Sequence, residues 1–286
     1  MKKITKVLMA AVAVSTLCFA GCKMADDVIG GDFIDYTTKF NKETGAEVTA
    51  SIDYTNETDD TERGIRLLND KKKDIAVNII MDDVASKSGF MSVIFNKTEN
   101  EDDTLNFIAL GFNSKTTGNK AKMACTYYKN VSTADLTAKN FNRPKSDCIE
   151  LMPNRDDDGF ATTSITPVNG KLTVGFVITA KEGTTPYEVR VYKNKTTNEL
   201  NEIADAIAKG STYETPELKF DITNSDLGRI GDDSTKIIEA KIGFYANVYK
   251  GQTLKGEWQV ADISHNPDGI IWEDEIPNTL NIQLAE

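Results

Sequence analysis

The chain has 286 residues, of which 27% are charged and 40% hydrophobic, and its 44 acidic and 33 basic residues leave a formal net charge of −11. This composition is typical of a soluble globular protein and excludes a disordered tail or a polytopic membrane protein. A surface this acidic repels phosphate backbones, and the sequence has no basic stripe with interleaved aromatic residues, so we expect no binding to nucleic acid.

The N-terminus has the pattern of an export signal. Residues 1–6, MKKITK, are positively charged, and residues 7–20, VLMAAVAVSTLCFA, form an apolar run of 14 residues. That run is too short for a membrane-spanning helix, which needs about 20 apolar residues. The small residues Ala20 and Gly21 then lead directly into Cys22.

The stretch from Leu17 to Cys22 resembles the lipobox of bacterial lipoproteins, and Phe19, in place of the usual aliphatic residue, makes it similar to spirochaete lipoproteins. The resemblance implies a signal peptide over residues 1–21 and a lipidated tether over residues 22–46. It also implies diacylglycerol and palmitate-type acyl chains on Cys22, which would anchor the protein firmly to a membrane. The alternative is an ordinary signal peptide with an accidental cysteine.

The same resemblance places the protein in the cell envelope, anchored by lipid in the outer membrane or facing the periplasm. Lys23 follows the cysteine, where an Asp would retain an enterobacterial lipoprotein in the inner membrane. Outer-membrane transport is therefore permitted.

Beyond residue 46, short runs rich in Val, Ile, Phe and Tyr are separated by Asn, Asp, Gly and Ser, which is the pattern of strands and turns. The expected strands are residues 47–54, 73–81, 89–96, 104–113, 121–131, 148–152, 171–180, 187–194, 217–223, 236–250, 254–264 and 279–285. Residues 23–46 show no sustained period, apart from one short helical turn expected near residues 36–40.

One segment predicts a helix. In TTNELNEIADAIAKG, residues 196–210, Leu200, Ile203 and Ile207 recur at helical spacing. Asn198 can cap the start and Gly210 can end the helix, so we expect it near residues 198–209.

Regular alternation in GEWQV and YEVRV indicates antiparallel strands with one buried face, so the predicted class is an all-β antiparallel sandwich. The runs GKLTVGFVITA, PYEVRVYKN, KIGFYANVY and GEWQVADIS resemble the final strands of concanavalin-like and carbohydrate-binding jelly rolls. We expect one lectin-like domain over residues 47–286. Two sandwiches, 47–145 and 168–286, are the alternative, because residues 143–170 are rich in Pro, Asp and Gly.

The sequence NRDDDG contains half of a calcium loop. Asn154, Asp156 and Asp158 alternate before Gly159, so three oxygens could converge at a sharp turn, but the bidentate acid of a complete loop is replaced by Ile165. The two interpretations are a calcium site and a solvated acidic turn. No other cofactor is expected.

Cys125 and Cys148 are the only thiols that remain once Cys18 is removed with the signal and Cys22 is acylated. In an oxidising compartment they could form a disulfide. Two separately buried thiols are the equal alternative.

Four aromatic residues gather in the last 45 positions: Trp258, Trp272, Tyr245 and Tyr249. Flat rings flanked by Asp and Asn could bind sugar by stacking and hydrogen bonding. The alternative is that these rings pack the core of the sandwich.

An enzyme is not expected. His265 is the only histidine and lies in a turn, SHNPDG, and no phosphate-binding glycine loop is present. A glycoside hydrolase is less favoured, because the acids of WEDEIP are adjacent and Glu273 and Glu275 lie beside a proline. The hypothesis is a non-enzymatic binding module for carbohydrate, with an adhesin or structural envelope protein that binds a host or envelope protein as the alternative.

Overall fold

The computed structural model describes residues 28–29, 33–37, 41–59, 61–72, 74–82, 88–114, 121–132, 148–155, 161, 164–181, 185–211, 213–228 and 240–261. Trp272, His265, Cys22, Asp156 and Asp158 lie outside these ranges, as does the strand expected at 279–285.

One layer of the molecule is an eight-stranded antiparallel sheet. Its strands are β1 (Val28–Ile29), β4 (Glu62–Lys72), β14 (Ala240–Val248), β6 (Gly89–Glu99), β7 (Leu105–Asn113), β8 (Ala121–Val131), β9 (Cys148–Glu150) and β10 (Ser164–Ile165). Their order is β1-β4-β14-β6-β7-β8-β10, and β9 also pairs with β8.

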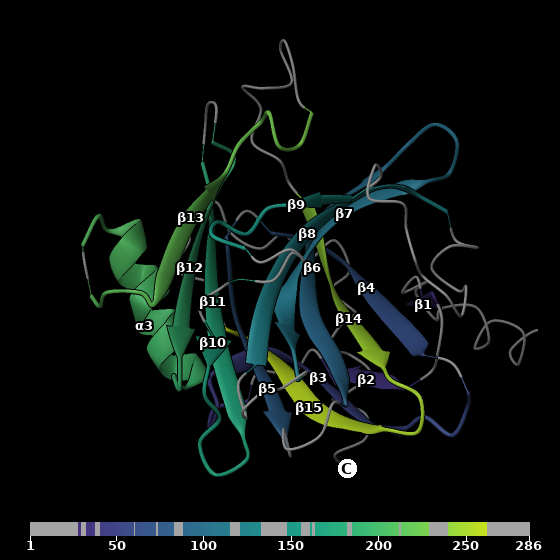
Figure 1. Cartoon of the computed structure of the whole chain (residues 1–286). Helices are drawn as coiled ribbons and strands as arrows, with labels where there is room; N and C mark the ends of the chain where they lie inside the picture. The colour runs from purple at the N-terminus through teal and green to yellow at the C-terminus, as the bar shows by residue number, and fades with distance from the viewer. Residues whose placement is uncertain are drawn as a thin grey trace, which may run out of the picture.

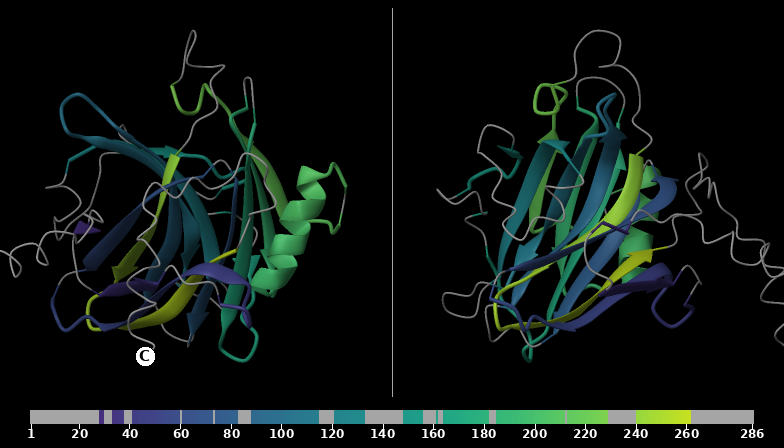
Figure 2. Two further views of the ribbon diagram at one scale, coloured as in Figure 1. Left: turned by 180° about the vertical axis from the view of Figure 1, so that it is seen from behind. Right: turned by 90° about the vertical axis from the view of Figure 1, so that its right-hand side faces the viewer.

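The second layer is a seven-stranded antiparallel sheet. Its order is β13 (Leu218–Ile222), β12 (Tyr187–Lys193), β11 (Leu172–Ala180), β5 (Ile75–Asp82), β15 (Thr253–Ala261), β3 (Ala46–Thr55) and β2 (Ile34–Thr37). The two sheets lie face to face, as Figures 1 and 2 show. The predicted all-β antiparallel sandwich is therefore confirmed.

The path of the chain is that of a jelly roll. From β3 to β6 successive strands alternate between the two sheets, and the late strands β14 and β15 insert between them, β14 between β4 and β6 and β15 between β3 and β5. Each sheet therefore contains strands from both halves of the chain. The alternative of two sandwiches, 47–145 and 168–286, is wrong for this reason, because neither half completes a sheet.

The main core lies between the sheets. Side chains that alternate along each strand meet there, and the largest that are fully buried include Phe95, Phe112, Phe176, Phe244 and Trp258. Burial of a side chain of this kind contributes about 1.5–3 kcal/mol each. A second apolar cluster lies on the outer face of the eight-stranded sheet and includes Phe90, Phe107 and Tyr245.

The helix α3 (Thr197–Ala208) covers part of the outer face of the seven-stranded sheet (Figure 1). Leu200 and Ile203 are buried against Ala76, Val177 and Tyr192 of that sheet. Among the residues described, no helix is long and apolar enough to cross a bilayer.

The helix begins one residue earlier than expected, and its N-cap lies two residues earlier. Thr196, not Asn198, is the N-cap, and Thr196 and Glu199 form a reciprocal capping box. At the other end Gly210 has a φ of +72°, and the Gly210 N–H donates to Ile207 O at 2.9 Å while the Ser211 N–H donates to Ala206 O at 2.8 Å. This is the Schellman motif, for which glycine is the favoured residue.

Strand β4 was not expected from the sequence. Its residues ERGIRLLNDKK carry six charges and lack regular alternation, and on its outer side the strand pairs only with the two-residue strand β1. A strand near the edge of a sheet tolerates charge that a central strand would not.

The segment expected to be a tether contributes two strands. Val28–Ile29 pairs with β4, and Ile34–Thr37 pairs with β3, so Tyr36 lies in β2 and not in a helical turn. The Arg66 guanidinium lies 4.4 Å from the centroid of the Tyr36 ring, a cation–π contact between the two sheets at this edge.

Candidate functional site

Polar and aromatic side chains meet on the outer face of the eight-stranded sheet. The first cross-strand row is Arg63, Asn247, Phe90, Asn113 and Lys122. The second row is Ile65, Tyr245, Ser92, Gly111 and Ala124. We call these ten residues, together with Tyr249, the Tyr245 face.

Tyr249 is held by the turn that connects β14 to β15. The Gln252 N–H donates to Tyr249 O at 3.0 Å, and Gly251 has a φ of +64°, which glycine adopts without strain. The Tyr249 N–H donates to Ser88 O at 3.0 Å, and Asn113 Nδ2 donates to the phenolic oxygen at 2.8 Å. The ring of Tyr249 is thus fixed beside the first row, and it is partly exposed.

Tyr245 lies deeper in the same face, with 4% of its surface exposed. Its ring centroid is 6.1 Å from that of Phe90, with the planes tilted by 59°. Burial raises the pKa of Tyr245, while the charge of Arg63 and hydrogen bonds from Asn247 and Arg63 act in the opposite direction. Both tyrosines therefore stay neutral at physiological pH, since burial also raises the pKa of Tyr249.

Two buried oxygens of this face have no hydrogen-bond partner within the part of the chain that the structure describes. They are Ser92 Oγ, on a residue with no exposed surface, and Asn247 Oδ1. Buried polar atoms are nearly always hydrogen-bonded in native proteins. These two atoms consequently indicate that a ligand or ordered water completes the site.

Gly111 lets β7 pack closely against Met91 and Ser92 of β6. A Cβ placed on Gly111 would lie 1.9 Å from Met91 O and 2.6 Å from Ser92 Cβ, so no other residue fits without moving the strands. Gly111 and Ser92 are both buried, so this close packing lies in the interior of the face. Exposure increases toward the ends of the first row, where Arg63, Asn247 and Lys122 are partly exposed.

Trp258 does not belong to this face. It is fully buried between the sheets, its ring centroid lies 5.5 Å from that of Phe244, and its Nε1 donates to Ser92 O at 3.0 Å. A sugar platform that includes Trp258 is therefore wrong, because the ring offers no face to a ligand. Of the four aromatic residues, the structure brings together Tyr245 and Tyr249, and Trp272 lies outside the described ranges.

The two cysteines are not joined by a disulfide. Cys125 is fully buried on the inner face of β8, whereas Cys148 pairs with Tyr128, whose side chain belongs to the outer face. A Cys125–Cys148 bridge is wrong for this register, because three residues along β8 separate the positions, about 10 Å, and the side chains point to opposite faces.

The calcium site is described in part. Asn154 is exposed with a φ of +51°, and Arg155 Nη1 donates to Glu150 O at 3.0 Å and to Met152 O at 3.2 Å. Asp156 and Asp158 lie outside the described residues, so calcium binding here stays a prediction. Elsewhere in the ranges given above, no group of three acidic, His or Cys side chains could hold a metal ion.

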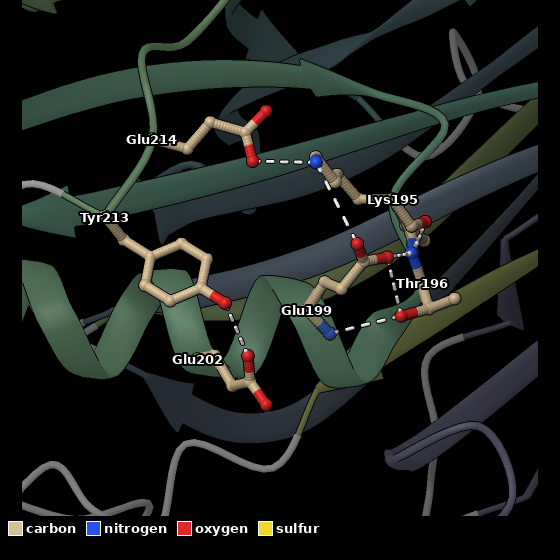
Figure 3. A network of polar contacts seen from close by, with 7 residues as sticks. Lys195, Thr196, Glu199, Glu202, Tyr213 and Glu214 are labelled. Carbon is tan, nitrogen blue, oxygen red and sulfur yellow. Dashed lines mark hydrogen bonds and ion pairs between the residues drawn. The ribbon is translucent and has the colours of Figure 1, made fainter.

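A second polar cluster surrounds the start of α3 (Figure 3). Lys195 Nζ lies 2.7 Å from Glu214 and 3.8 Å from Glu199, and Tyr213 donates to Glu202 at 2.8 Å. The hydrogen bonds from Thr196 lower the pKa of Glu199. These contacts tie the connection that follows the helix back onto it, which is a structural role.

Part of the Tyr245 face could have been found in the sequence. In FYANVY, residues 244–249, period-two alternation puts Tyr245, Asn247 and Tyr249 on one side of a strand. Arg63, Ser92 and Asn113 come from three other strands, and only the register between strands brings them to the same place.

Comparison with known proteins gives no family. No family model and no curated protein matches the sequence.

Solved structures with a similar chain trace include three of known character. The lectin UEA-II complexed with galactose is 10% identical over 80% of this chain and 96% of that chain, with a TM-score of 0.34. The exoplasmic/lumenal domain of VIP36 in a Ca²⁺/Man3GlcNAc-bound form is 10% identical over 85% of this chain and 92% of that chain, with a TM-score of 0.37. The β-glucanase of Bacillus licheniformis is 14% identical over 80% of this chain and 98% of that chain, with a TM-score of 0.31. At these identities and TM-scores, none of the three assigns a ligand or a reaction to this chain.

Proposed function

We propose that the protein is a lipid-anchored envelope lipoprotein whose sandwich binds carbohydrate, without enzymatic activity, through the Tyr245 face. The observation that carries the binding function is the set of unsatisfied buried oxygens, Ser92 Oγ and Asn247 Oδ1, beside aromatic rings and amides. Saccharides present both the hydroxyl groups and the apolar ring faces that such a surface can bind.

The non-enzymatic assignment follows from the composition of the same face. Glycoside hydrolysis needs two carboxylates about 5–9.5 Å apart. Neither of the two rows contains an Asp or Glu at any described position. Binding without bond cleavage is therefore the function that these residues support.

The lipid anchor is proposed from the lipobox-like stretch ending at Cys22. Five residues, 23–27, separate Cys22 from the first residue of β1. Six residue steps span at most about 21 Å. The anchor would therefore hold the β1 edge of the sandwich close to the bilayer, where Ile29 pairs with Ile65, the first residue of the second row.

Binding is tested with a Cys22→Ser form of the protein that lacks the acyl chains but retains the full mature sequence. On a glycan array, we expect saturable binding that Tyr249→Ala lowers at least tenfold. Tyr213→Ala is the matched control, because Tyr213 is also exposed but lies beside α3. An array that stays blank overturns the carbohydrate proposal, and pull-downs from envelope extracts would then test a protein partner.

The anchor is tested separately by metabolic labelling with a palmitate analogue. We expect the label on the wild-type protein, recovered with membranes, and its loss in Cys22→Ser, recovered in the soluble fraction. A wild-type protein that is secreted without label would overturn the anchor and leave the binding proposal untouched.

A further inference from the structure

The strand β13 forms one edge of the seven-stranded sheet. Within the described ranges it pairs only with β12, at the end of the sheet opposite β2. The helix α3 packs mainly on β5, β11 and β15, and Lys219 and Asp221 on the outer side of β13 are exposed. An edge strand of this kind offers a row of unpaired backbone N–H and C=O groups to another strand. We propose that two copies of the chain form a symmetric dimer by pairing β13 of one copy with β13 of the other.

Two-fold symmetry fixes the register of this pairing. A two-fold axis perpendicular to the sheet runs the two strands antiparallel and keeps side chains that share a side of the sheet opposite one another. All five residues of the strand, Leu218–Ile222, are paired only when the axis passes through the central residue, Phe220. In that register Lys219 lies opposite the partner's Asp221, and Leu218 lies opposite the partner's Ile222.

The register brings opposite charges together at two symmetric positions. Within one copy the cross-strand neighbours have like charges, because Lys219 lies opposite Arg190 and Asp221 lies opposite Glu188. Lys219 pairs diagonally with Glu188 at 3.0 Å, whereas Asp221 has no ion pair or side-chain hydrogen bond within the described part of the chain. The partner's Lys219 would supply a cation directly opposite this carboxylate. Opposite charges across two strands stabilise their pairing, and like charges weaken it.

The inner side of β13 is apolar and joins the core. Ile222 is fully buried, Phe220 is 8% exposed, and Leu218 is partly buried against the core. The two-fold axis places Phe220 beside the partner's Phe220, and the partner's Ile222 beside Leu218. The apolar side of the joined sheet is then continuous from one copy to the other.

The sequence around β13 favours its own copy over other strands. Pro216, two residues before the strand, has no N–H to donate, so it ends the pairing on that side. A lysine on an edge strand discourages pairing with unrelated strands, but a second β13 presents an acid at the matching position. Each copy has one β13, so the antiparallel contact closes at two copies and does not propagate into a fibre.

The oligomeric state tests the proposal. The experiment uses the Cys22→Ser protein, which retains the mature sequence without acyl chains, and follows sedimentation velocity over a wide range of protein concentration. We expect a reversible equilibrium between monomer and dimer, because a strand pair this short is at the low end of specific interfaces. Added NaCl should weaken the dimer by screening its ion pairs. Hydrogen exchange across β13 should be slower in the dimer than in the monomer.

Charge reversal locates the contact. Asp221→Lys puts like charges opposite each other at both symmetric positions, so we expect the dimer affinity to fall at least about tenfold. The double variant, Lys219→Asp with Asp221→Lys, exchanges the two charges and should restore the dimer. Glu188 keeps a neighbouring cation in the double variant, because position 221 lies directly opposite it.

The matched control is Asp53→Lys, which makes the same change of charge on the outer side of the same sheet. Asp53 is an exposed acid in β3, paired with Lys255 at 2.6 Å, and β3 is not an edge strand. This variant should leave the dimer affinity unchanged. Melting curves at concentrations where the protein is monomeric establish that each variant is folded.

Each outcome supports or overturns a stated part of the proposal. A chain that stays monomeric at every concentration overturns the dimer. A dimer that Asp221→Lys weakens no more than Asp53→Lys does overturns the assignment to β13. A folded double variant that dimerises no better than Asp221→Lys overturns the register centred on Phe220, and assemblies that grow beyond two copies overturn the symmetric closure.

Discussion

The indole Nε1 of Trp258, in the seven-stranded sheet, donates a 3.0 Å hydrogen bond to the carbonyl oxygen of Ser92 in the facing sheet. The Ser92 carbonyl oxygen thus binds Trp258 inside the sandwich, while the Ser92 side chain belongs to the candidate ligand face outside. The bond fixes the position of β6, the strand that supplies Phe90 and Ser92 to that face.

Trp258 is therefore expected to affect stability rather than ligand contact. Trp258→Ala should lower the free energy of unfolding by about 3–5 kcal/mol, because it leaves a cavity in the core. Trp258→Phe keeps much of the volume but leaves Ser92 O without its donor, at a cost of about 1–3 kcal/mol. Urea unfolding followed by circular dichroism measures both. A Trp258→Ala protein as stable as the wild type would contradict this location.

Glu188 predicts a loss of stability in acid. Its side chain is 4% exposed and pairs with Lys181, with Arg190 and, at 3.0 Å, with Lys219. Burial acts to raise the pKa of Glu188, but hydrogen bonds from Lys181 and Lys219 and the charge of Arg190 outweigh it, so the pKa is lowered. A lowered carboxyl pKa stabilises the fold above the unfolded value of 4.5 and loses that contribution as pH falls through the folded value.

Glu188→Gln should consequently destabilise the protein at pH 7, by about 2 kcal/mol, between the small effect of an exposed pair and the larger effect of a fully buried one. At pH 3 the difference from the wild type should shrink, because Glu188 is then becoming neutral in both states. Asp221→Asn is the control, since Asp221 is the exposed carboxylate directly opposite on β13. Unfolding free energies of the wild type and of both variants, measured at pH 7 and pH 3, test this prediction. A difference between the wild type and Glu188→Gln that is the same at both pH values would contradict a lowered pKa for Glu188.

The cap of α3 gives a third prediction. Thr196→Ala should cost about 1 kcal/mol of stability, because it removes the side-chain acceptor of the Glu199 N–H. Asn198→Ala should cost less than about 0.5 kcal/mol, since Asn198 is exposed and not the cap. Thermal melting of the two variants separates them. The reverse order of stabilities would restore Asn198 as the N-cap of the helix.

The cysteines should differ in reactivity. Burial raises the pKa of the Cys125 thiol well above its usual range, and the charges of Glu150 and Asp226 act in the same direction. In a Cys22→Ser background, Ellman's reagent should leave Cys125 unmodified in the folded protein and modify it after denaturation. The variants Cys148→Ser and Cys125→Ser show which thiol reacts with Ellman's reagent under each condition. A denatured protein that shows no thiol until a reductant is added would reveal a disulfide.

The Tyr245 face and the fold were predictable to different degrees. Alternation in YEVRV of β12 and GEWQV of β15, together with short runs rich in Val, Ile, Phe and Tyr, was sufficient for the sandwich, and the spacing of Leu200, Ile203 and Ile207 was sufficient for the helix. Alternation in FYANVY could also have placed Tyr245 and Tyr249 on one side of a strand. It could not separate the inner face from the outer face, which is why the sequence left open whether Trp258 binds sugar or packs in the core.

By itself, the sequence determined the all-β class, most strand positions and the single helix, because these depend on periodicity over a few neighbouring residues. The tertiary structure alone decided that Arg63, Ser92 and Asn113 share one surface, that Cys125 and Cys148 point apart, and that β14 and β15 insert among the early strands. Those relationships are set by the pairing of strands distant in sequence. Pairing is fixed by burial of whole sheet faces against each other, a property of the assembled sandwich and of no short segment.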